Sequence, residues 1–562
     1  MASISTLLDR LDELRVSFGP GAAERVSAVL DELEAKPAPN VESLARLHEA
    51  LLFVRAYPHD AEVRKQAERA LARFGRRVGE LRDAGLDLEP LEEPDVSGIA
   101  GTGISAVFSY GVARDLSRRH ARRIEIDWEY YEKPAHLGRA LPRLLPLLAE
   151  DSLVEAVVPY RAWVEAAAHN HPSSLGWLME RLARLPVERA AEIYDSLELM
   201  LRWEWGLSTA SRTRTRLAPR RYFYQKTPLL ERRDIDFAAE LETEPLPVER
   251  LSKEEGARVL ELMRDTSAVR YRELHGFTFG DEARVLRADA GRGVEIYVTV
   301  VPPAHRLPLR AYHGGMFFRN GVPIGYVEGL SLFEHMEVGF NLYYTFREGE
   351  TAWLYARTAR LFRQLAGVEC FSVDPYQIGH QNEEAIASGA FWFYRKLGFR
   401  PTGTEQAELC RREEERMRKR PGYRTPPGRL RQLAREPLLY EHRGRAAGEW
   451  DGFAARNVGL AVARKMAAEY GGDPERMRAA AGARVAEQLG PRLDRVPAAE
   501  QLALAINLDA ELEGWRPAEK RLAARVIRAK AGPDVGAYLL LMQRHERLRR
   551  LFLDAGAGAI RR

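Results

Sequence analysis

The chain has 562 residues, several times the size of a typical domain, so we expect several separate hydrophobic cores. Hydrophobic residues make up 45% and charged residues 30% of the chain, a composition that excludes wholesale disorder. The 85 basic and 81 acidic side chains leave a formal charge of only +4, which gives no reason to expect a nucleic-acid partner.

The first half of the chain is mainly helical in pattern. Apolar residues at helical spacing predict a module over residues 1–95, which ends in the Pro-rich acidic stretch LEPLEEPD. Residues 96–210 contain a Gly-rich turn and a strand-like IEIDWEYY but are otherwise helical, so they predict a second, mostly helical module. Residues 211–244 are polar and Arg-rich, which predicts an exposed linker that contacts its surroundings only through aromatic side chains.

The centre of the chain begins with a predicted β-hairpin. Two strand-like runs, LRAYHGGMFFRN and VPIGYVEGLSLF, are separated by Asn320-Gly321, the pair that most readily adopts the positive φ angles of a tight turn. A third strand-like run, EVGFNLYYTF, follows. These patterns predict neighbouring strands of one sheet.

Helices and strands then alternate. The run TAWLYARTARLFRQL has apolar residues every three or four positions and predicts a helix, and VECFSV predicts a short strand before Asp374-Pro375. A further helix is predicted over NEEAIASGAFWFYRKLGFRP, with Gly398 at its end in a left-handed conformation. This order predicts an α+β domain with a mixed sheet, flanked by all-α regions at both ends of the chain.

The heptapeptide FYRKLGF, Phe393 to Phe399, closely resembles the last-helix signature of GNAT acyltransferases, and the preceding hairpin, strand and helix occur in that family's order. The resemblance covers about 155 residues from Pro245 to Arg400. We therefore interpret residues 245–445 as a GNAT-like domain and residues 446–562 as a helical C-terminal domain. The resemblance implies transfer of an acyl group from acyl-CoA to an amine of a small molecule or a protein, and acetyl is the acyl group we expect.

The resemblance also implies a cofactor site at the start of the helix that follows the third strand, where backbone amides and the helix dipole favour a pyrophosphate. Aligning the family's loop places Arg347 first and Ala352 last, but Glu350 stands where the family has glycine, and Gly349 lies one position early. The carboxylates of Glu348 and Glu350 in this loop would repel a pyrophosphate. The alternative is that they only interact favourably with the helix dipole, whether or not a ligand binds. The predicted cofactor-binding residues are Arg347, Gly349, Glu350, Thr351, Ala352 and Asn382.

The resemblance implies catalytic roles for three side chains. Tyr394 occupies the position of the family's general acid; the alternative is a tyrosine of the core. Glu337 lies close to the family's general base, and His335 is on the same face of the predicted strand; the alternative is an exposed carboxylate at a sheet edge. Asn382 precedes the last helix, where it suits an N-cap as well as a cofactor contact.

Other features narrow the expectations. Two cysteines, Cys370 and Cys410, cannot form a disulfide framework or a four-thiolate metal site, and we predict no metal centre. No run approaches the roughly 20 apolar residues of a membrane span, so we expect a cytoplasmic protein without a membrane partner. The helical regions are candidates for protein partners. Two alternatives to an acyl-CoA-dependent enzyme remain. One is a non-catalytic GNAT-fold binding or scaffold protein. The other is an aminoacyl-tRNA-dependent transferase, which would be recognised by salt-sensitive binding of tRNA.

Overall fold

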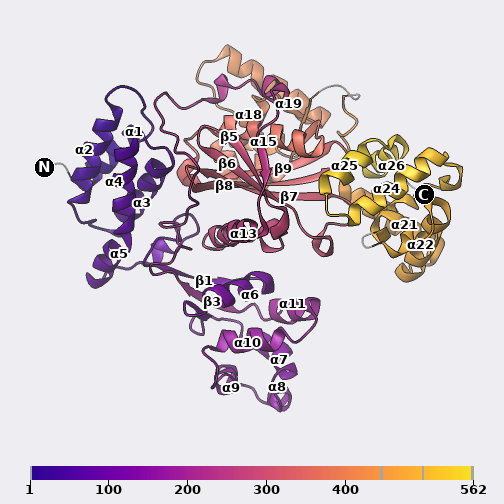
Figure 1. Cartoon of the computed structure of the whole chain (residues 1–562), viewed down its shortest axis with the longest axis horizontal. Coiled ribbons are helices and arrows are strands. Elements are labelled where there is room, and N and C mark those ends of the chain that lie inside the picture. Colours follow the sequence, from indigo (N-terminus) through magenta and orange to yellow (C-terminus); the bar gives the residue numbers. More distant parts are fainter. Residues whose placement is uncertain (1–2, 443–446, 497–498, 559–562) are drawn as a thin grey trace.

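The computed structural model describes residues 3–442, 447–496 and 499–558. A large mixed sheet occupies the centre, with a helical module at the N-terminus, a second module below it and helices of the C-terminus on the opposite side (Figure 1). The chain is thus mixed α/β, as the sequence patterns predicted. In these three ranges, no helix combines the length and the apolar character needed to cross a bilayer.

The central sheet has nine strands among the described residues, in the order β11-β12-β10-β9-β8-β7-β6-β5-β4. Strands β9 and β10 pair in parallel, and every other pair of neighbouring strands in the described part of this sheet is antiparallel. The strand bounds are β4 Val248–Arg250, β5 Leu286–Gly291, β6 Val294–Thr299, β7 Ala311–Arg319, β8 Val322–Leu332, β9 His335–Leu342, β10 Cys370–Val373, β11 Arg400–Pro401 and β12 Leu438–Glu441.

The predicted hairpin is confirmed. Strands β7 and β8 pair from Arg319↔Val322 onward, and Asn320 and Gly321 have φ angles of 49° and 79°. A Cβ atom on Gly321 would lie 1.9 Å from the carbonyl oxygen of Leu217, so glycine is required both by the backbone angle and by the close contact.

Helices cover both faces of the sheet. Adjacent strand residues point to opposite faces. The Tyr312 hydroxyl accepts a hydrogen bond at 3.1 Å from the amide of Gly276 in α14 (His275–Thr278). Helix α14 follows α13 (Lys253–Ala268) in the chain. The neighbouring His313 instead contacts Phe362 of α15 (Thr351–Ala366), with ring centroids 5.9 Å apart. Helices α13 and α14 therefore lie on one face and α15 on the other.

The predicted helix over residues 382–398 is interrupted. Helix α17 (Glu383–Ser388) ends at Gly389, whose φ of 68° breaks the helical path, and α18 (Ala390–Arg395) starts directly after it. Gly398 has the predicted positive φ, at 103°. The short α16 (Pro375–Ile378) precedes both helices, and α12 (Phe237–Glu242) packs against α15.

The N-terminal module is helical, as predicted. It consists of α1 (Ile4–Leu14), α2 (Ala22–Glu34), α3 (Val41–Ala56), α4 (Ala61–Ala72) and α5 (Phe74–Asp83). Its buried residues belong to the same hydrophobic cluster as those of the central sheet. The module therefore packs on the sheet domain.

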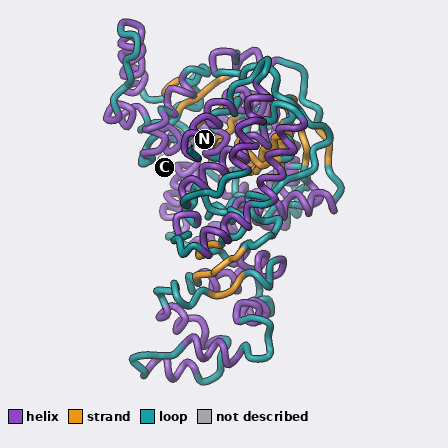
Figure 2. The backbone as a smooth tube through the Cα atoms, turned by 90° about the vertical axis from the view of Figure 1, so that its left-hand side faces the viewer, coloured by secondary structure: helices purple, strands orange, loops and turns teal. Residues whose placement is uncertain are grey.

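The second module has a core of its own and projects away from the rest of the chain (Figure 2). Three antiparallel strands in the order β1-β3-β2 support its helices, so it contains more sheet than the sequence predicted. Its elements are β1 Gly103–Val107, β2 Ile124–Ile126, β3 Met200–Glu204, α6 Tyr110–Arg119, α7 Leu137–Ala140, α8 Leu148–Val154, α9 Tyr160–Ala167, α10 Ser174–Leu182 and α11 Val187–Asp195.

The expectation of an exposed linker over residues 211–244 is wrong in its first part. Arg212 and Thr213 are 4% and 1% exposed, and Arg212 forms an ion pair with Glu49 of α3 at 2.5 Å. Arg55 donates to the carbonyl of Thr213 at 2.8 Å. The polar residues of this segment therefore join the N-terminal module to the sheet through buried hydrogen bonds.

Eight α-helices lie between β11 and the end of the described chain, two of them before β12. They are α19 Thr404–Lys419, α20 Pro427–Leu433, α21 Ala455–Tyr470, α22 Pro474–Leu489, α23 Ala499–Ile506, α24 Pro517–Ala531, α25 Val535–Gln543 and α26 Glu546–Gly556. One junction with the sheet is the buried ion pair between Arg549 and Glu334, which also accepts a hydrogen bond from the Trp450 indole at 3.0 Å.

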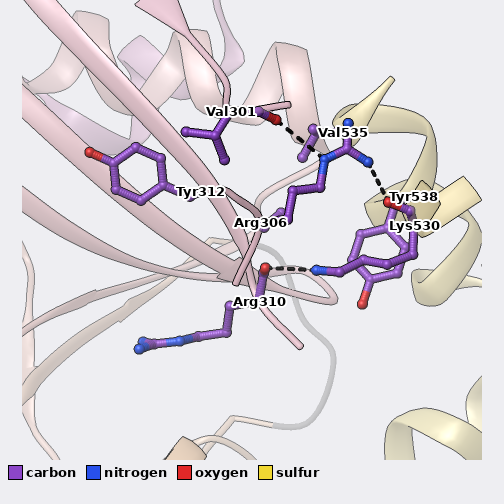
Figure 3. Close-up of a pocket in the computed structure, with 8 residues that line it drawn as sticks. Val301, Arg306, Arg310, Tyr312, Lys530, Val535 and Tyr538 are labelled. Atoms are coloured by element: carbon purple, nitrogen blue, oxygen red, sulfur yellow. Dashed lines mark hydrogen bonds between the residues drawn. The ribbon is translucent and has the colours of Figure 1, made fainter. Parts of the chain in front are cut away.

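A second junction is formed by Lys530, which is 1% exposed (Figure 3). Its Nζ donates to the carbonyls of Arg310 at 3.0 Å and Leu309 at 3.3 Å, and Arg306 donates to the Lys530 carbonyl. These groups surround a cavity of about 10 Å³, too small for an organic ligand. We therefore regard this site as structural.

Candidate active site

A cleft opens where strands β9 and β10 separate. Their parallel pairing ends at Glu337↔Ser372, while β9 continues to Leu342. Residues 338–342 therefore have an edge without a strand partner in the described part of the chain. The cleft beside this edge has a volume of about 660 Å³, which is within the usual range for small-molecule sites.

The cleft passes from one face of the sheet to the other. Four consecutive residues, 339–342, line it, although adjacent side chains of a strand point to opposite faces. Phe340 packs edge-on against Tyr355 of α15, with ring centroids 5.2 Å apart. Asn341 instead donates to the hydroxyl of Tyr326 at 3.1 Å, on the face of α13. Two ligands that approach from opposite faces can therefore meet in the gap between β9 and β10.

The N-terminus of α15 opens into this cleft. Thr351 and Ala352 line it. The amides of Ala352 and Trp353, in the first turn, donate to no acceptor among the residues that the structure describes. Free amides and the positive end of the helix dipole favour an anionic group here.

Glu350 does not block this helix end. Its carboxylate, 1% exposed, is bound on the side away from the cleft by Arg319 at 2.7 Å and by Arg292. It also accepts a hydrogen bond from the amide of Leu230 at 3.1 Å. Burial alone would raise the pKa of Glu350, but the hydrogen bond from Arg292 and the charge of Arg319 outweigh burial and hold the pKa below its usual value. The expected repulsion of a pyrophosphate is therefore offset by two arginines.

The remaining residues of this turn are held by ion pairs and close packing. Arg347 pairs with Glu384 of α17, and both residues line the cleft. Glu348 pairs with Arg15 of the N-terminal module at 2.8 Å. A Cβ atom on Gly349 would lie 2.2 Å from the hydroxyl oxygen of Tyr57, so only glycine fits beside this tyrosine.

Tyr394 of α18 lines the cleft, as expected for a catalytic acid. Its ring packs against that of Tyr355, with centroids 5.4 Å apart, and is 5% exposed. The hydroxyl makes no hydrogen bond within the described ranges, and burial raises its pKa. The phenol therefore keeps its proton at neutral pH and has that proton free for a ligand.

The structure does not bring His335 and Glu337 to the cleft. The His335 ring stacks on Trp450 with centroids 4.7 Å apart, and burial lowers its pKa to about 4. Glu337 pairs with Arg310 at 3.4 Å, and burial raises its pKa. Neither is among the residues that line the cleft. The prediction of a base at these positions is therefore corrected: β9 is still paired with β10 at both residues, so the gap begins after them.

Asn382 is the N-cap of α17, and it also lines the cleft. Its Oδ1 accepts from the amide of Ala385 at 3.1 Å, and its Nδ2 donates to the carbonyl of Tyr376 at 3.1 Å. The N-cap interpretation is confirmed, and the side chain is already engaged on both ends.

Sequence reasoning missed Glu328, the carboxylate that lines the cleft on the α13 face. It accepts a hydrogen bond from the Tyr312 hydroxyl at 2.5 Å and forms no ion pair within the described residues. A signal was present: Tyr326 and Glu328 alternate within an otherwise apolar strand, as two polar side chains on one face do.

Gln377 was also missed. Its Nε2 donates to the carbonyl of Val338 at 3.2 Å, and its Oε1 accepts from the amide of Phe340 at 3.3 Å. The carboxamide therefore takes the place of a strand on the free edge of β9. Because alternate residues of a strand direct their N–H and C=O groups to the same side, the Phe340 carbonyl and the Leu342 amide also face the cleft.

Positive charge gathers beside α18. Arg232 lines the cleft and donates to the carbonyl of Lys396 at 3.4 Å. Burial lowers the pKa of Lys396, and the charges of Arg232 and Arg424 lower it further. None of the three forms an ion pair with a carboxylate in the part of the chain that the structure covers. Such a group favours an anionic ligand.

Comparison with protein-family models, curated proteins and solved structures finds no match to this chain. Function is therefore inferred from the cleft and its residues.

Proposed function

We propose that the protein is an N-acyltransferase that moves an acyl group, acetyl in the first place, from acyl-CoA to an amine, and that its central domain is GNAT-like. One observation carries this proposal. The amide-lined N-terminus of α15 opens, free of Glu350, into a cleft that crosses the sheet beside the Tyr394 hydroxyl, which has no hydrogen-bond partner among the described residues.

The order of elements supports a GNAT-like domain. An antiparallel meander ends in β9, and α15 and the parallel strand β10 follow. The signature FYRKLGF, whose resemblance to GNAT acyltransferases the sequence revealed, spans the end of α18 and the turn after it. Strand β9 separates from its neighbour β10, and the edge of β9 that is left open lies next to the N-terminus of α15.

The residues of the cleft fit acyl-CoA. The first-turn amides of α15 suit its pyrophosphate, and Arg232, Lys396 and Arg424 supply positive charge for its other phosphate. A bound acyl-CoA would supply a thioester as the acyl donor. We place this donor on the α15 face and the amine on the α13 face, with Glu328 nearby.

The reaction needs two proton transfers. Glu328 accepts a proton from the ammonium form of the acceptor, which frees the nitrogen lone pair. The nitrogen attacks the carbonyl carbon, the C–N bond forms, the C–S bond breaks, and the departing sulfur takes a proton from Tyr394. The remaining amine proton and the proton held by Glu328 leave to solvent, and Tyr394 takes one proton back from solvent.

A charge variant of the cleft tests the binding step. Thr351 lines the cleft in the first turn of α15. A glutamate there stabilises the helix dipole but repels a pyrophosphate, so Thr351→Glu should keep the fold and weaken acetyl-CoA binding at least about ten-fold. Thr351→Gln is the matched control, because it has the same shape without the charge.

The measurement is calorimetric titration of acetyl-CoA into the full chain. Equal affinity of the two variants, or no heat from the unmodified protein at millimolar ligand, would overturn the proposed cofactor site. Binding without release of free thiol from acetyl-CoA in the presence of any amine would favour the non-catalytic binding protein.

A further inference from the structure

The α13 face of the cleft carries two opposite charges that have no ion-pair partner in the described part of the chain. Glu328 of β8 and Arg272, which follows α13, both line the cleft. Neither forms an ion pair within the described residues, although most other charged side chains of the cleft do: Arg347 pairs with Glu384, and Glu348 with Arg15.

Each of these two charges is hydrogen-bonded to a tyrosine hydroxyl: Arg272 to that of Tyr326, and Glu328 to that of Tyr312. Arg272 donates to the Tyr326 hydroxyl at 3.4 Å, and Asn341 donates to the same hydroxyl at 3.1 Å. Tyr326 and Glu328 are two positions apart on β8 and therefore point to the same face, about 7 Å apart along the strand.

One carboxylate and one guanidinium on the same face of the cleft suit a small zwitterion. In an α-amino acid, the ammonium and the carboxylate are joined through one carbon atom. Two charge-assisted hydrogen bonds of about 2.8 Å each, one at either end of such a molecule, span roughly 8 to 9 Å between the protein groups. Glu328 would bind the ammonium, and Arg272 the carboxylate.

We infer that the acyl acceptor of this cleft is a free α-amino acid, with its amino group at Glu328 and its carboxylate at Arg272. This inference rests on the proposed function, and it restricts the acceptor to amines that carry a carboxylate on the adjacent carbon. Simple alkylamines satisfy only Glu328 and leave Arg272 without a partner. Amino-acid amides likewise bind well only to Glu328, because their neutral amide group is a weaker acceptor than a carboxylate for the Arg272 guanidinium.

The test uses the full chain with acetyl-CoA and measures thiol release in the presence of each of the twenty amino acids. The best acceptor is then compared with its carboxamide and with the amine that lacks its carboxyl group. We expect kcat/KM for the amino acid to exceed that for either analogue at least about ten-fold, the usual effect of losing a charge-assisted hydrogen bond.

Variants assign the carboxylate contact. Arg272→Gln should lower the ratio of kcat/KM between amino acid and carboxamide at least about ten-fold, and Arg272→Lys should restore part of it, because it keeps the charge. Arg76→Gln, on the exposed surface of α5, is the control and should leave the ratio unchanged.

The outcomes separate this inference from the proposed function. If acetyl-CoA produces no calorimetric heat, the proposed function fails and the acceptor assignment fails with it. If acetyl-CoA binds but the carboxamide or the alkylamine is used equally well, or no amino acid supports thiol release, only the assignment of α-amino acids is overturned. An unchanged ratio in Arg272→Gln would remove Arg272 from the acceptor site.

Discussion

Arg319 of β7 donates to Glu350 at the start of α15 at 2.7 Å, and both side chains are 1% exposed. This contact decides which way the acidic residue of the turn faces. Because Arg319 and Arg292 hold the Glu350 carboxylate, the first-turn amides of α15 face the cleft without this carboxylate in front of them.

Replacing Arg319 with methionine should be strongly destabilising. Glu350 would keep only Arg292, and a buried carboxylate that loses a partner costs about 3 to 5 kcal/mol. We expect this loss in the free energy of unfolding measured with urea. The control Arg76→Met breaks the exposed pair with Glu80 and should have no measurable effect. Equal stability of the two variants would mean that Arg292 alone compensates Glu350.

Tyr394→Phe should separate catalysis from binding. The Tyr394 hydroxyl has no partner in the described structure, so its loss should leave the melting temperature and the KM for acetyl-CoA nearly unchanged. It should lower kcat about 100-fold if the hydroxyl protonates the departing sulfur. Tyr355→Phe is the control: it removes a buried hydroxyl that also lacks a partner, and the rate should stay within about two-fold. A rate for Tyr394→Phe equal to that control would remove Tyr394 from the mechanism.

Gln377→Ala should strengthen acetyl-CoA binding several-fold. The Gln377 carboxamide occupies the Val338 carbonyl and the Phe340 amide, and a ligand that runs along β9 must displace it. Gln364 offers a matched control, because its carboxamide bridges the amide and carbonyl of Leu246 in the same way, outside the cleft. Calorimetry should find the affinity of Gln364→Ala unchanged. Weaker binding by Gln377→Ala would show instead that Gln377 holds the ligand.

Lys530 should make stability depend on pH. Burial, followed by the charge of Arg306, lowers its pKa to about 7 from an ordinary value of 10.5. Between pH 7 and about 10 the unfolded chain therefore binds more protons at this residue than the folded chain, so the Lys530 contribution to stability rises with pH. Below pH 7 both states are protonated, and the full cost of the buried charge remains.

The measurement is the melting temperature of the unmodified protein minus that of Lys530→Met, taken at several pH values from 6 to 9.5. The difference should shift in favour of the unmodified protein as the pH rises. Lys419→Met, at an exposed position of α19, should give a constant difference. If the melting temperatures of Lys530→Met and the unmodified protein differed by the same amount at every pH, the lowered pKa of Lys530 would be contradicted.

Local signals predicted the part of the fold that frames the cleft. The Asn320-Gly321 turn, the helical spacing that became α15, and the short apolar run that became β10 each depend on neighbouring residues. Strands β5 and β6 were not predicted, and of the small sheet of the second module only β2, within the strand-like IEIDWEYY, was anticipated. Their runs are short and lie among glycines and charged residues, so pairing with distant strands decides their conformation.

The site was predictable only in outline. The position of Tyr394 followed from a compact motif, whereas the orientation of Glu350 depends on Arg319 and Arg292, which are 31 and 58 positions away. His335 and Glu337 were placed on the correct strand. The sequence could not indicate at which residue β9 and β10 stop pairing, and this decides which side chains of β9 reach the cleft.

The contacts of Arg15 with Glu348 and of Tyr57 with Gly349 have a consequence for how the chain can be divided. Two side chains near the beginning of the polypeptide shape a turn that lies roughly 300 positions further along the chain. Trimming the protein to its sheet would retain the strands yet release the loop on which ligand binding depends. The helical N-terminus in this sense supports the candidate active site, and shortened versions should lose affinity for acetyl-CoA before they lose their fold.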